Sequence, residues 1–351
     1  MKSAEDLFLC RFYVIMGKNE ALMRRDRKTE VKKMVAIPTL FSDVLMFVLL
    51  IIPGFFMGRA GKIADSALGS MTNILMYIAM PFLVFSKLIE TDLRTLSPIA
   101  VMVCMTAPIA VIALIVGMSS FVFPQHEGDT HWRASRFCAA FANCGFLGIP
   151  LASVLFPAYP EVAVYVSLYN VVNTFLLLTV GVYILSGDRR DISIRRALVS
   201  PIAGAIMLGL LCAVFDLASV MPRIAIYSGH LASLTTPLSM IVLGVELSKV
   251  KPSTLIQTRA LYPVALLKLV AAPMLICTLL LILRLIGVPL PQTLIVAIFL
   301  ATAVSTAASA PAMSQKYGVD GGFAAILTLG CTVMCALTLP LLYLILELFL
   351  F

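Results

Sequence analysis

The sequence predicts an all-α polytopic membrane protein with ten transmembrane helices, arranged as two inverted five-helix repeats. The first observation is composition: 61% of the 351 residues are hydrophobic and 13% are charged, whereas a soluble domain is about 45–50% apolar and about 25% charged. The second is a series of apolar runs of about 20 residues, the length at which a helix crosses a bilayer. The third is a pairing of prolines between the two halves of the chain. A soluble bundle could not bury this much apolar surface, so the expected environment is a lipid bilayer.

Residues 1–33 differ in composition from the rest and are expected to lie outside the fold. They hold nine of the 26 Lys and Arg residues, and their apolar piece, residues 7–16, is interrupted by Arg11. No small-residue cleavage site follows, which argues against a signal peptide. Two interpretations stay open: a basic interfacial or disordered tail, or an upstream extension of a protein that begins at Met34.

Ten apolar segments follow this extension. We expect a first repeat over residues 34–189 and a second over 190–351. Because five spans per half is an odd number, the second half enters the membrane from the opposite side, which makes the repeat inverted. The expected spans are 38–58, 68–89, 98–123, 134–156, 160–186, 198–219, 225–248, 260–284, 291–315 and 322–350.

Basic residues in the loops predict the orientation of the chain. The loops after the odd-numbered spans carry twelve Lys and Arg residues, and the opposite loops carry four. The positive-inside rule places the first set in the cytoplasm and both termini outside, although the nine charges of the basic extension argue against that orientation. Topology thus explains the net charge of +8, and we expect no nucleic-acid partner. The twelve are Arg59, Lys62, Arg133, Arg136, Arg189, Arg190, Arg195, Arg196, Lys249, Lys251, Arg259 and Lys316; the four are Lys87, Arg94, Arg223 and Arg284.

Prolines support the internal repeat. Three prolines of spans 2 to 4 have partners in spans 7 to 9, between 156 and 165 residues further along the chain. Prolines are common in membrane helices, so a chance alignment is the alternative. The pairs are Pro81 with Pro237, Pro108 with Pro273, and Pro150 with Pro311.

Spans 4 and 9 are expected to break near their centres, at a crossover that forms the binding site. Breakers at bilayer depth free backbone groups, which are tolerated only inside protein or beside a cavity. Two half-helix N-termini that face each other would suit a carboxylate; close packing of small residues around a kink is the alternative. The candidate residues are Asn143, Cys144, Gly145, Gly148 and Pro150 in span 4, and Ser305, Thr306, Ser309 and Pro311 in span 9.

Span 5 adds two amides to the candidate site. Asn170 and Asn173 are three residues apart and therefore share a helix face, which should point away from lipid. They are expected either to contact the ligand or to form hydrogen bonds between helices. In span 7, Thr235 and Thr236 precede Pro237, where their hydroxyls are expected to satisfy freed carbonyls.

Ionisable residues within the spans are few. Lys268 lies in span 8 and Glu246 near the end of span 7. The two are expected to pair, or else Lys268 snorkels to the interface or attracts an anion. No carboxylate lies at the expected midplane, which weakens a mechanism in which a buried Asp or Glu carries a proton or binds sodium. Backbone carbonyls alone would still be able to bind a sodium ion.

Neither a catalytic centre nor a metal site is predicted. The sequence has no CxxC pair, no HExxH motif and no paired aspartates within spans. The three histidines, His126, His131 and His230, lie near the expected membrane surfaces. We therefore expect no enzymatic activity and no cofactor, and we interpret the cysteines within the spans as small packing residues.

Five short motifs together resemble the auxin efflux carrier family. They are Asn143–Pro150, Tyr169–Asn173, Leu234–Leu238, Lys316–Asp320 and Leu337–Pro340, within a match over about residues 38–350. The resemblance implies ten helices in two inverted repeats, with helices 4 and 9 crossing at their breaks. It also implies export or exchange of organic anions: indole-acetate in plants, malate or malonate in bacteria. The absence of a long central hydrophilic loop makes the chain more similar to compact bacterial members of the plasma membrane.

The resulting hypothesis is a secondary transporter that moves a small mono- or dicarboxylate by alternating access. A coupling ion, proton or sodium, and a homodimer are both left open by the sequence. The rival class is a non-transporting membrane sensor that binds a ligand in the same cavity. Flux without chemical change of the ligand would distinguish a transporter from a sensor or an enzyme.

Overall fold

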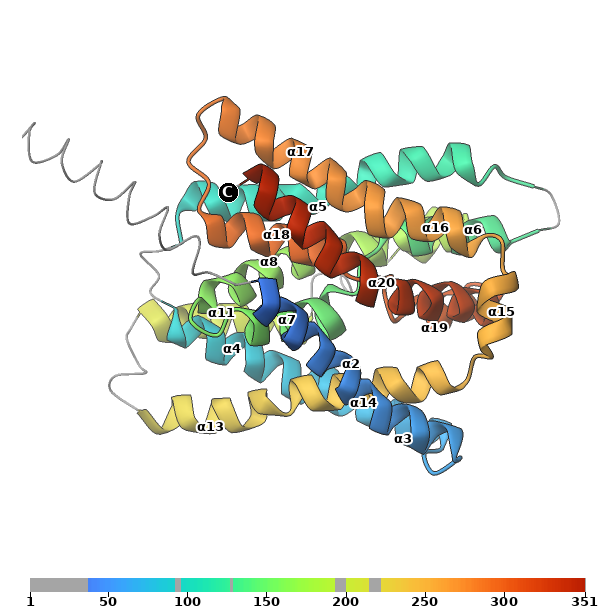
Figure 1. Ribbon diagram of the computed structural model, residues 1–351, viewed down its shortest axis with the longest axis horizontal. Coiled ribbons are helices and arrows are strands. Elements are labelled where there is room, and N and C mark those ends of the chain that lie inside the picture. Colours follow the sequence, from blue (N-terminus) through green and yellow to red (C-terminus); the bar gives the residue numbers. More distant parts are fainter. Residues whose placement is uncertain (1–36, 92–95, 127–128, 193–199, 215–221, 351) are drawn as a thin grey trace, which may run out of the picture.

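The computed structural model describes residues 37–91, 96–126, 129–192, 200–214 and 222–350 (Figure 1). The basic extension, residues 1–33, lies outside the described residues. Within them, all regular secondary structure is helical apart from one isolated β-bridge. The prediction of an all-α protein is confirmed for this part of the chain.

Each expected span coincides with one helix or with a chain of consecutive helical pieces. Six of these stretches are long and apolar enough to cross a membrane: Asp65–Glu90, Pro98–Val122, Pro160–Ser186, Arg223–Ser248, Leu261–Leu285 and Gly321–Leu346. Shorter apolar helices occupy the other four ranges: Leu49–Arg59, Cys144–Leu155, Pro201–Ala213 and Gln292–Ala303.

The helices occur in the following order. The first half contains α2 (Ile37–Arg59), α3 (Asp65–Ile74), η1 (Leu75–Ala79), α4 (Met80–Glu90), α5 (Pro98–Val122), α6 (His131–Ala140), η3 (Cys144–Gly148), α7 (Ile149–Leu155), α8 (Pro160–Leu176), η4 (Leu177–Gly181), α9 (Val182–Ser186) and η5 (Arg189–Asp191). The second half contains α11 (Pro201–Val214), α13 (Pro222–Ser233), α14 (Thr235–Ser248), α15 (Pro252–Gln257), α16 (Leu261–Ala265), η6 (Leu266–Ala271), α17 (Ala272–Leu285), α18 (Gln292–Ala303), α19 (Ala310–Lys316) and α20 (Gly321–Leu350).

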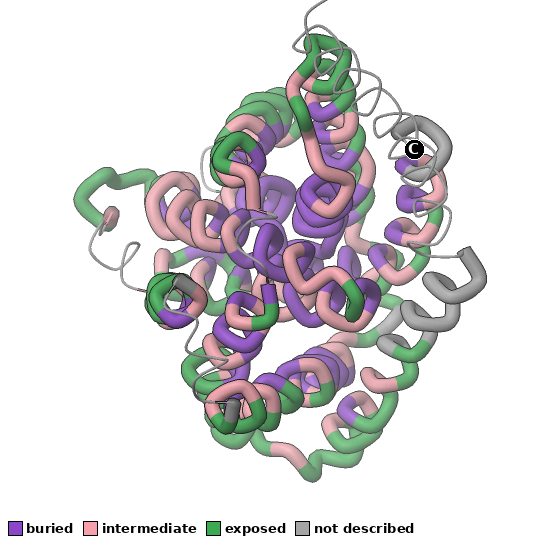
Figure 2. Tube along the Cα trace, turned by 90° about the vertical axis from the view of Figure 1, so that its left-hand side faces the viewer, coloured by how far each residue is buried: buried purple, intermediate pink, exposed green. Residues whose placement is uncertain are grey.

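The outer surface is apolar. Large hydrophobic side chains are exposed on several outward helix faces, among them Phe121 at 88% exposure and Leu337 at 73%. Figure 2 shows the buried residues gathered in the interior and the exposed ones on the peripheral helices. A soluble monomer rarely exposes so much contiguous apolar surface, whereas lipid tails solvate it without cost.

The helices pack into two bundles. One consists of α2, α3 and α4, α11, and α13 and α14, which contact one another extensively. The other consists of α5, α6 and α7, α8 and α9, α16 and α17, α18 and α19, and α20. In Figure 1, α3, α4, α13 and α14 lie in the lower half, and α5, α16, α17 and α18 in the upper half. Each bundle combines helices from both halves of the sequence, and the second bundle contains both broken helices.

Wide turns mark several prolines. The π-helical segments η1, η3 and η6 come immediately before α4, α7 and α17, whose second residues are Pro81, Pro150 and Pro273. A proline has no N–H to donate, and its ring collides with the carbonyl four residues earlier. One widened turn before the proline accommodates this collision without ending the helix.

Candidate functional site

Two broken helices cross in the centre of the second bundle. Helix α6 ends at Ala140 and η3 begins at Cys144, while α18 ends at Ala303 and α19 begins at Ala310. The two intervening segments run antiparallel and form the isolated bridge between Ala142 and Thr306.

Backbone hydrogen bonds join the two crossing segments. The N–H of Asn143 donates to the carbonyl of Ser305 at 2.8 Å, and the N–H of Ala307 donates to that of Phe141 at 3.0 Å. These bonds satisfy backbone groups that the broken helices leave without intrahelical partners. At the crossover the two non-helical segments are therefore bonded to each other and form a packed junction.

Side chains close the end of α6 at this junction. The hydroxyl of Thr306 donates to the carbonyl of Cys138 at 2.8 Å. The amide Nδ2 of Asn173, on α8, donates to the carbonyl of Ala142 at 3.2 Å. Both side chains are buried, so neutral donors from two other elements hold the first break in place.

The end of α18 is closed differently. Its last three carbonyls each accept a hydrogen bond from a different element: Ala301 from the thiol of Cys144 at 3.0 Å, Thr302 from the ammonium of Lys268 at 3.0 Å, and Ala303 from the thiol of Cys335 at 3.5 Å. Two cysteines that the sequence identified as packing residues thus also serve as donors at the second break.

The expected ion pair between Lys268 and Glu246 is not formed. Lys268 is 1% exposed and bonded to Thr302 at the crossover, so it does not snorkel to the interface either. Glu246 lies on α14, in the other bundle. The residues are separated because η6 and α14 belong to different bundles, which their positions along the chain do not reveal.

A cavity of about 450 Å³ lies between the two bundles, against the crossover. The first bundle contributes residues of α3, η1, α4, α11 and α14, and the second contributes both breaks and one face of α8 and η4. The lining residues are Thr72, Met76, Met80, Ala142, Asn143, Gly145, Phe146, Leu147, Asn170, Val171, Asn173, Thr174, Leu177, Leu178, Ser200, Pro201, Ile202, Ser239, Val242, Leu243, Glu246, Ala307, Ala308, Ser309, Ala312 and Met313.

Comparison with known proteins points to membrane transporters. A family model described as "Membrane transport protein" matches residues 39–200. An uncharacterized transporter of Methanothermobacter thermautotrophicus is 25% identical over 215 residues, covering 59% of this chain and 68% of that protein. An uncharacterized transporter of Methanocaldococcus jannaschii is 29% identical over 217 residues, covering 58% and 68%. Over residues 39–200 the chain is therefore similar to a family of membrane transport proteins, and both relatives are named as transporters.

These similarities support the auxin efflux carrier family that the motifs suggested, and they indicate a membrane transporter. The match includes the first break and the two amides of α8. A transporter must expose a solute site to each side of the membrane in turn. A cavity that lies between two helix bundles is suited to that requirement.

The predicted site residues fall into two groups. Asn143, Gly145, Asn170, Asn173 and Ser309 line the cavity. The rest lie in the packed junction beside it, where Cys144 and Thr306 donate the bonds described above. The remaining members of that second group are Gly148, Pro150, Ser305 and Pro311.

Three features of the cavity were not predicted. Glu246 lines it, although its place in the sequence is near the end of a span. Ser239 and a pair of methionines, Met76 and Met80, complete the wall of the first bundle. A signal existed for Glu246, because an ionisable residue inside a membrane span is a candidate functional residue by default. The methionines gave none, since apolar residues are expected everywhere in a span.

The charge pattern of the lining is simple. Glu246 is the one ionisable residue among the described lining residues, and the polar remainder consists of amides and hydroxyls. The Oδ1 atom of Asn173 is buried and has no hydrogen-bond partner. Apart from the carboxyl of Glu246, a solute in this cavity would therefore meet neutral donors and acceptors and many apolar side chains.

One polar prediction for span 7 is wrong. The hydroxyl of Thr235 was expected to satisfy a carbonyl freed by Pro237, but it is buried and has no hydrogen-bond partner. The helix instead breaks at Leu234, between α13 and α14. The carbonyl that Pro237 would free is that of Ser233, four residues earlier. The hydroxyl of Ser239 donates to a different carbonyl, that of Thr236, at 2.9 Å.

Proposed function

We propose that the protein is a secondary transporter that moves a small organic anion across the membrane by alternating access. The observation that carries this proposal is the cavity between the two bundles, which ends against the crossover of two broken helices. Rocking of one bundle against the other would open this cavity to each side in turn. The amides of Asn143, Asn170 and Asn173 supply the polar contacts.

The architecture behind this mechanism is proposed to be ten transmembrane helices in two inverted five-helix repeats, residues 34–189 and 190–351. The antiparallel pairing of Ala142 with Thr306 supports it, because two copies related by an axis in the membrane plane cross antiparallel. The placement of both breaks at one junction is further support. The proposed location is the plasma membrane of a bacterial-type cell, with the more basic set of loops in the cytoplasm.

The proposed substrate is a small carboxylate, and the lining favours one carboxylate group on an apolar body. The side-chain N–H groups of Asn143 and Asn170, which line the cavity, are suited to donate hydrogen bonds to such a group. A dicarboxylate such as malate or malonate carries a second charge. That charge would be buried without a cation in the lining, which is costly.

A flux assay in proteoliposomes tests this proposal. We expect uptake of an auxin-like aromatic monocarboxylate to exceed that of malate or malonate. Asn143→Ala should weaken transport by roughly 10- to 100-fold, since a lost hydrogen bond to a charged group costs about 1.5–3 kcal/mol. The matched control is Asn73→Ala, which removes an exposed amide from α3 and should leave flux unchanged.

The same assay separates the competing outcomes. Wild-type flux by Asn143→Ala would refute the assignment of this amide to the site. Faster flux of dicarboxylates would refute the preference for a monocarboxylate. Saturable binding without any flux would instead indicate a membrane sensor.

A further inference from the structure

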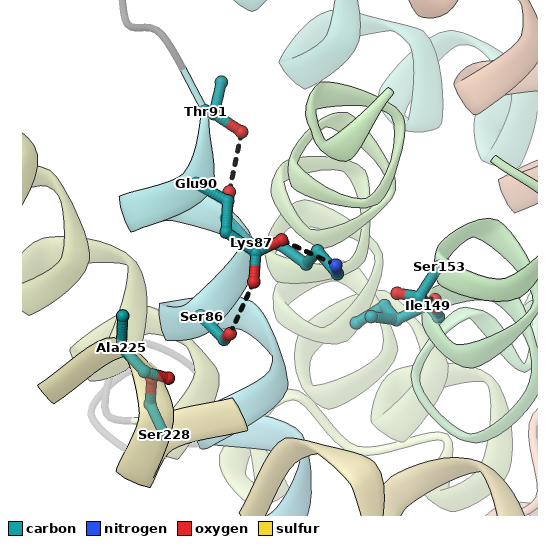
Figure 3. Close-up of polar contacts among 8 residues, drawn as sticks. All are labelled: Ser86, Lys87, Glu90, Thr91, Ile149, Ser153, Ala225 and Ser228. Atoms are coloured by element: carbon teal, nitrogen blue, oxygen red, sulfur yellow. Dashed lines mark hydrogen bonds and ion pairs between the residues drawn. The ribbon is translucent and has the colours of Figure 1, made fainter. Parts of the chain in front are cut away.

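Lys268 is a buried cation that the proposed substrate site does not use. Its side chain is 1% exposed, and its ammonium donates to the carbonyl of Thr302 at 3.0 Å. Among the described residues, no carboxylate lies within ion-pair distance of it. Lys87, at the end of α4, shows the contrast: its ammonium lies 2.7 Å from the carboxylate of Glu90 (Figure 3).

The position of the ammonium explains how the charge is tolerated. Thr302 lies in the last turn of α18, where the carbonyls lack intrahelical partners and form the negative end of the helix dipole. The neighbouring carbonyls of Ala301 and Ala303 accept from the thiols of Cys144 and Cys335. Among the described residues, the one charged donor at this helix end is therefore the ammonium of Lys268, and the helix end supplies part of its compensating charge.

In transporters built from inverted repeats, the C-terminal end of a broken helix has a known role. Half-helix C-terminal ends and unwound carbonyls near the midplane commonly coordinate the coupling cation in such proteins. Here the end of α18 is occupied by a side chain of the protein itself. The matching end of α6 is filled by neutral donors, the hydroxyl of Thr306 and the amide of Asn173.

We propose that Lys268 is a built-in cation that takes the place of an exchangeable Na⁺ at the end of α18, so that transport does not require Na⁺. The inference rests on the proposed transport function and deepens it. An ammonium tethered to η6 stays with the protein when the substrate leaves. Substrate movement is consequently not coupled to a cation at this helix end, and the protein works there as a uniporter or exchanger.

A thermal-unfolding series tests the built-in cation without relying on transport. The purified full-length protein and Lys268→Ala are compared in choline chloride, NaCl and ethylammonium chloride at equal ionic strength. Ethylammonium reproduces the severed end of the side chain. We expect the wild-type midpoint to be the same in all three salts and that of Lys268→Ala to rise in NaCl or ethylammonium, because a cation that binds only the folded state raises its stability.

Substitutions separate the charge from its packing. Lys268→Met keeps most of the volume and removes the charge, and we expect it to fold with an unchanged or higher unfolding midpoint, since apolar isosteres of buried ions are often stabilising. Its flux should nevertheless fall, within roughly the 5- to 150-fold range of couplings between sites. Lys268→Arg should retain more flux than Lys268→Met. Lys87→Met, which removes a partly buried ammonium that is paired with Glu90, is the control and should retain wild-type flux.

Several results would overturn the proposal. One is wild-type flux or stability that rises saturably with Na⁺ at constant ionic strength. Another is wild-type flux by Lys268→Met. A third is a Lys268→Ala midpoint that no cation raises, together with a lowered midpoint for Lys268→Met, because that pair would assign Lys268 a structural role. If the wild type moves no carboxylate, the transport proposal fails, and the salt series on Lys268→Ala still decides the cation proposal.

Discussion

At the scale of single residues, Asp320 shows how a short motif serves the fold. Its Oδ1 accepts the N–H of Phe323 at 3.0 Å, which caps the start of α20. Its Oδ2 lies 3.4 Å from Nε2 of His131, whose ring stacks on Phe323 with centroids 4.1 Å apart. Gly318, two residues earlier, has a φ of +72°, which favours glycine. The Lys316–Asp320 motif is thus explained by a turn, a cap and a link to α6.

This cap predicts a pH dependence of stability. The N–H of Phe323, followed by the contact with His131, lowers the pKa of Asp320 below its ordinary value. A carboxyl group whose pKa is lower in the folded state stabilises the folded protein at pH values above its unfolded-state pKa. This stabilisation is lost as the pH falls through the folded-state pKa. Asp320→Asn should therefore lower the unfolding midpoint near neutral pH, and the difference from wild type should shrink in acid.

Unfolding midpoints measured between about pH 7 and pH 3 check this expectation. Asp188→Asn is a suitable control, because Asp188 caps a different helix, η5, through the N–H of Arg190. A difference between Asp320→Asn and wild type that grows as the pH falls would contradict the assigned sign.

At the scale of elements, the contact between α2 and α14 depends on glycine. A Cβ added to Gly54 would overlap the backbone carbonyl of Ile241, and one added to Gly244 would overlap that of Ile51. Without side chains at these points the two backbones approach closely, as small residues allow in membrane helices. This contact holds the first bundle together across the two halves of the sequence.

Alanine substitution tests the close approach. Gly54→Ala and Gly244→Ala should each destabilise the protein by about 1–3 kcal/mol, because overpacking forces the backbones apart. Gly117→Ala is the matched control: it also lies within a helix, but a Cβ there meets open space. The control should be neutral or slightly stabilising, since alanine is the better helix former. Equal effects at all three glycines, measured as unfolding midpoints, would argue against the contact.

At the scale of the whole molecule, the cavity lies between the two bundles, and the proposed alternating access requires a solute to pass through it. Gly145 lines this space, and a Cβ there would meet the Asn170 amide at 3.7 Å and Met80 Cε at 3.8 Å, ordinary contacts. Gly145→Ala should therefore fold and transport. Gly145→Leu should fold but lose flux by about tenfold or more, because its longer side chain extends across the gap between the bundles.

Flux and unfolding midpoint measured together distinguish blocking from misfolding. Gly69→Leu, at an open position on α3, controls for the cost of a leucine on an exposed face. Flux by Gly145→Leu at the wild-type rate would show that the solute takes another path.

Much of this organisation followed from the sequence. Hydrophobic runs located the helices, because in lipid every span must satisfy its own backbone and so has a fixed minimum length. The two breaks were predicted from Asn143, Pro150 and Pro311. Prolines and polar side chains at bilayer depth are tolerated only inside the protein or beside a cavity. The five short motifs indicated the transporter family that the comparisons support.

The tertiary structure alone decided which side chains face the cavity and which hold the junction. Asn143 lines the cavity, whereas the thiol of its neighbour Cys144 donates to the carbonyl of Ala301. Which of the two side chains faces the cavity depends on the rotation about its own axis of the helix that follows the break. Lys268 and Glu246 lie in different bundles because helices far apart in the chain pack side by side. Composition and periodicity determine which segments form helices. The rotation and the neighbours of each helix are set by packing against elements from other parts of the chain.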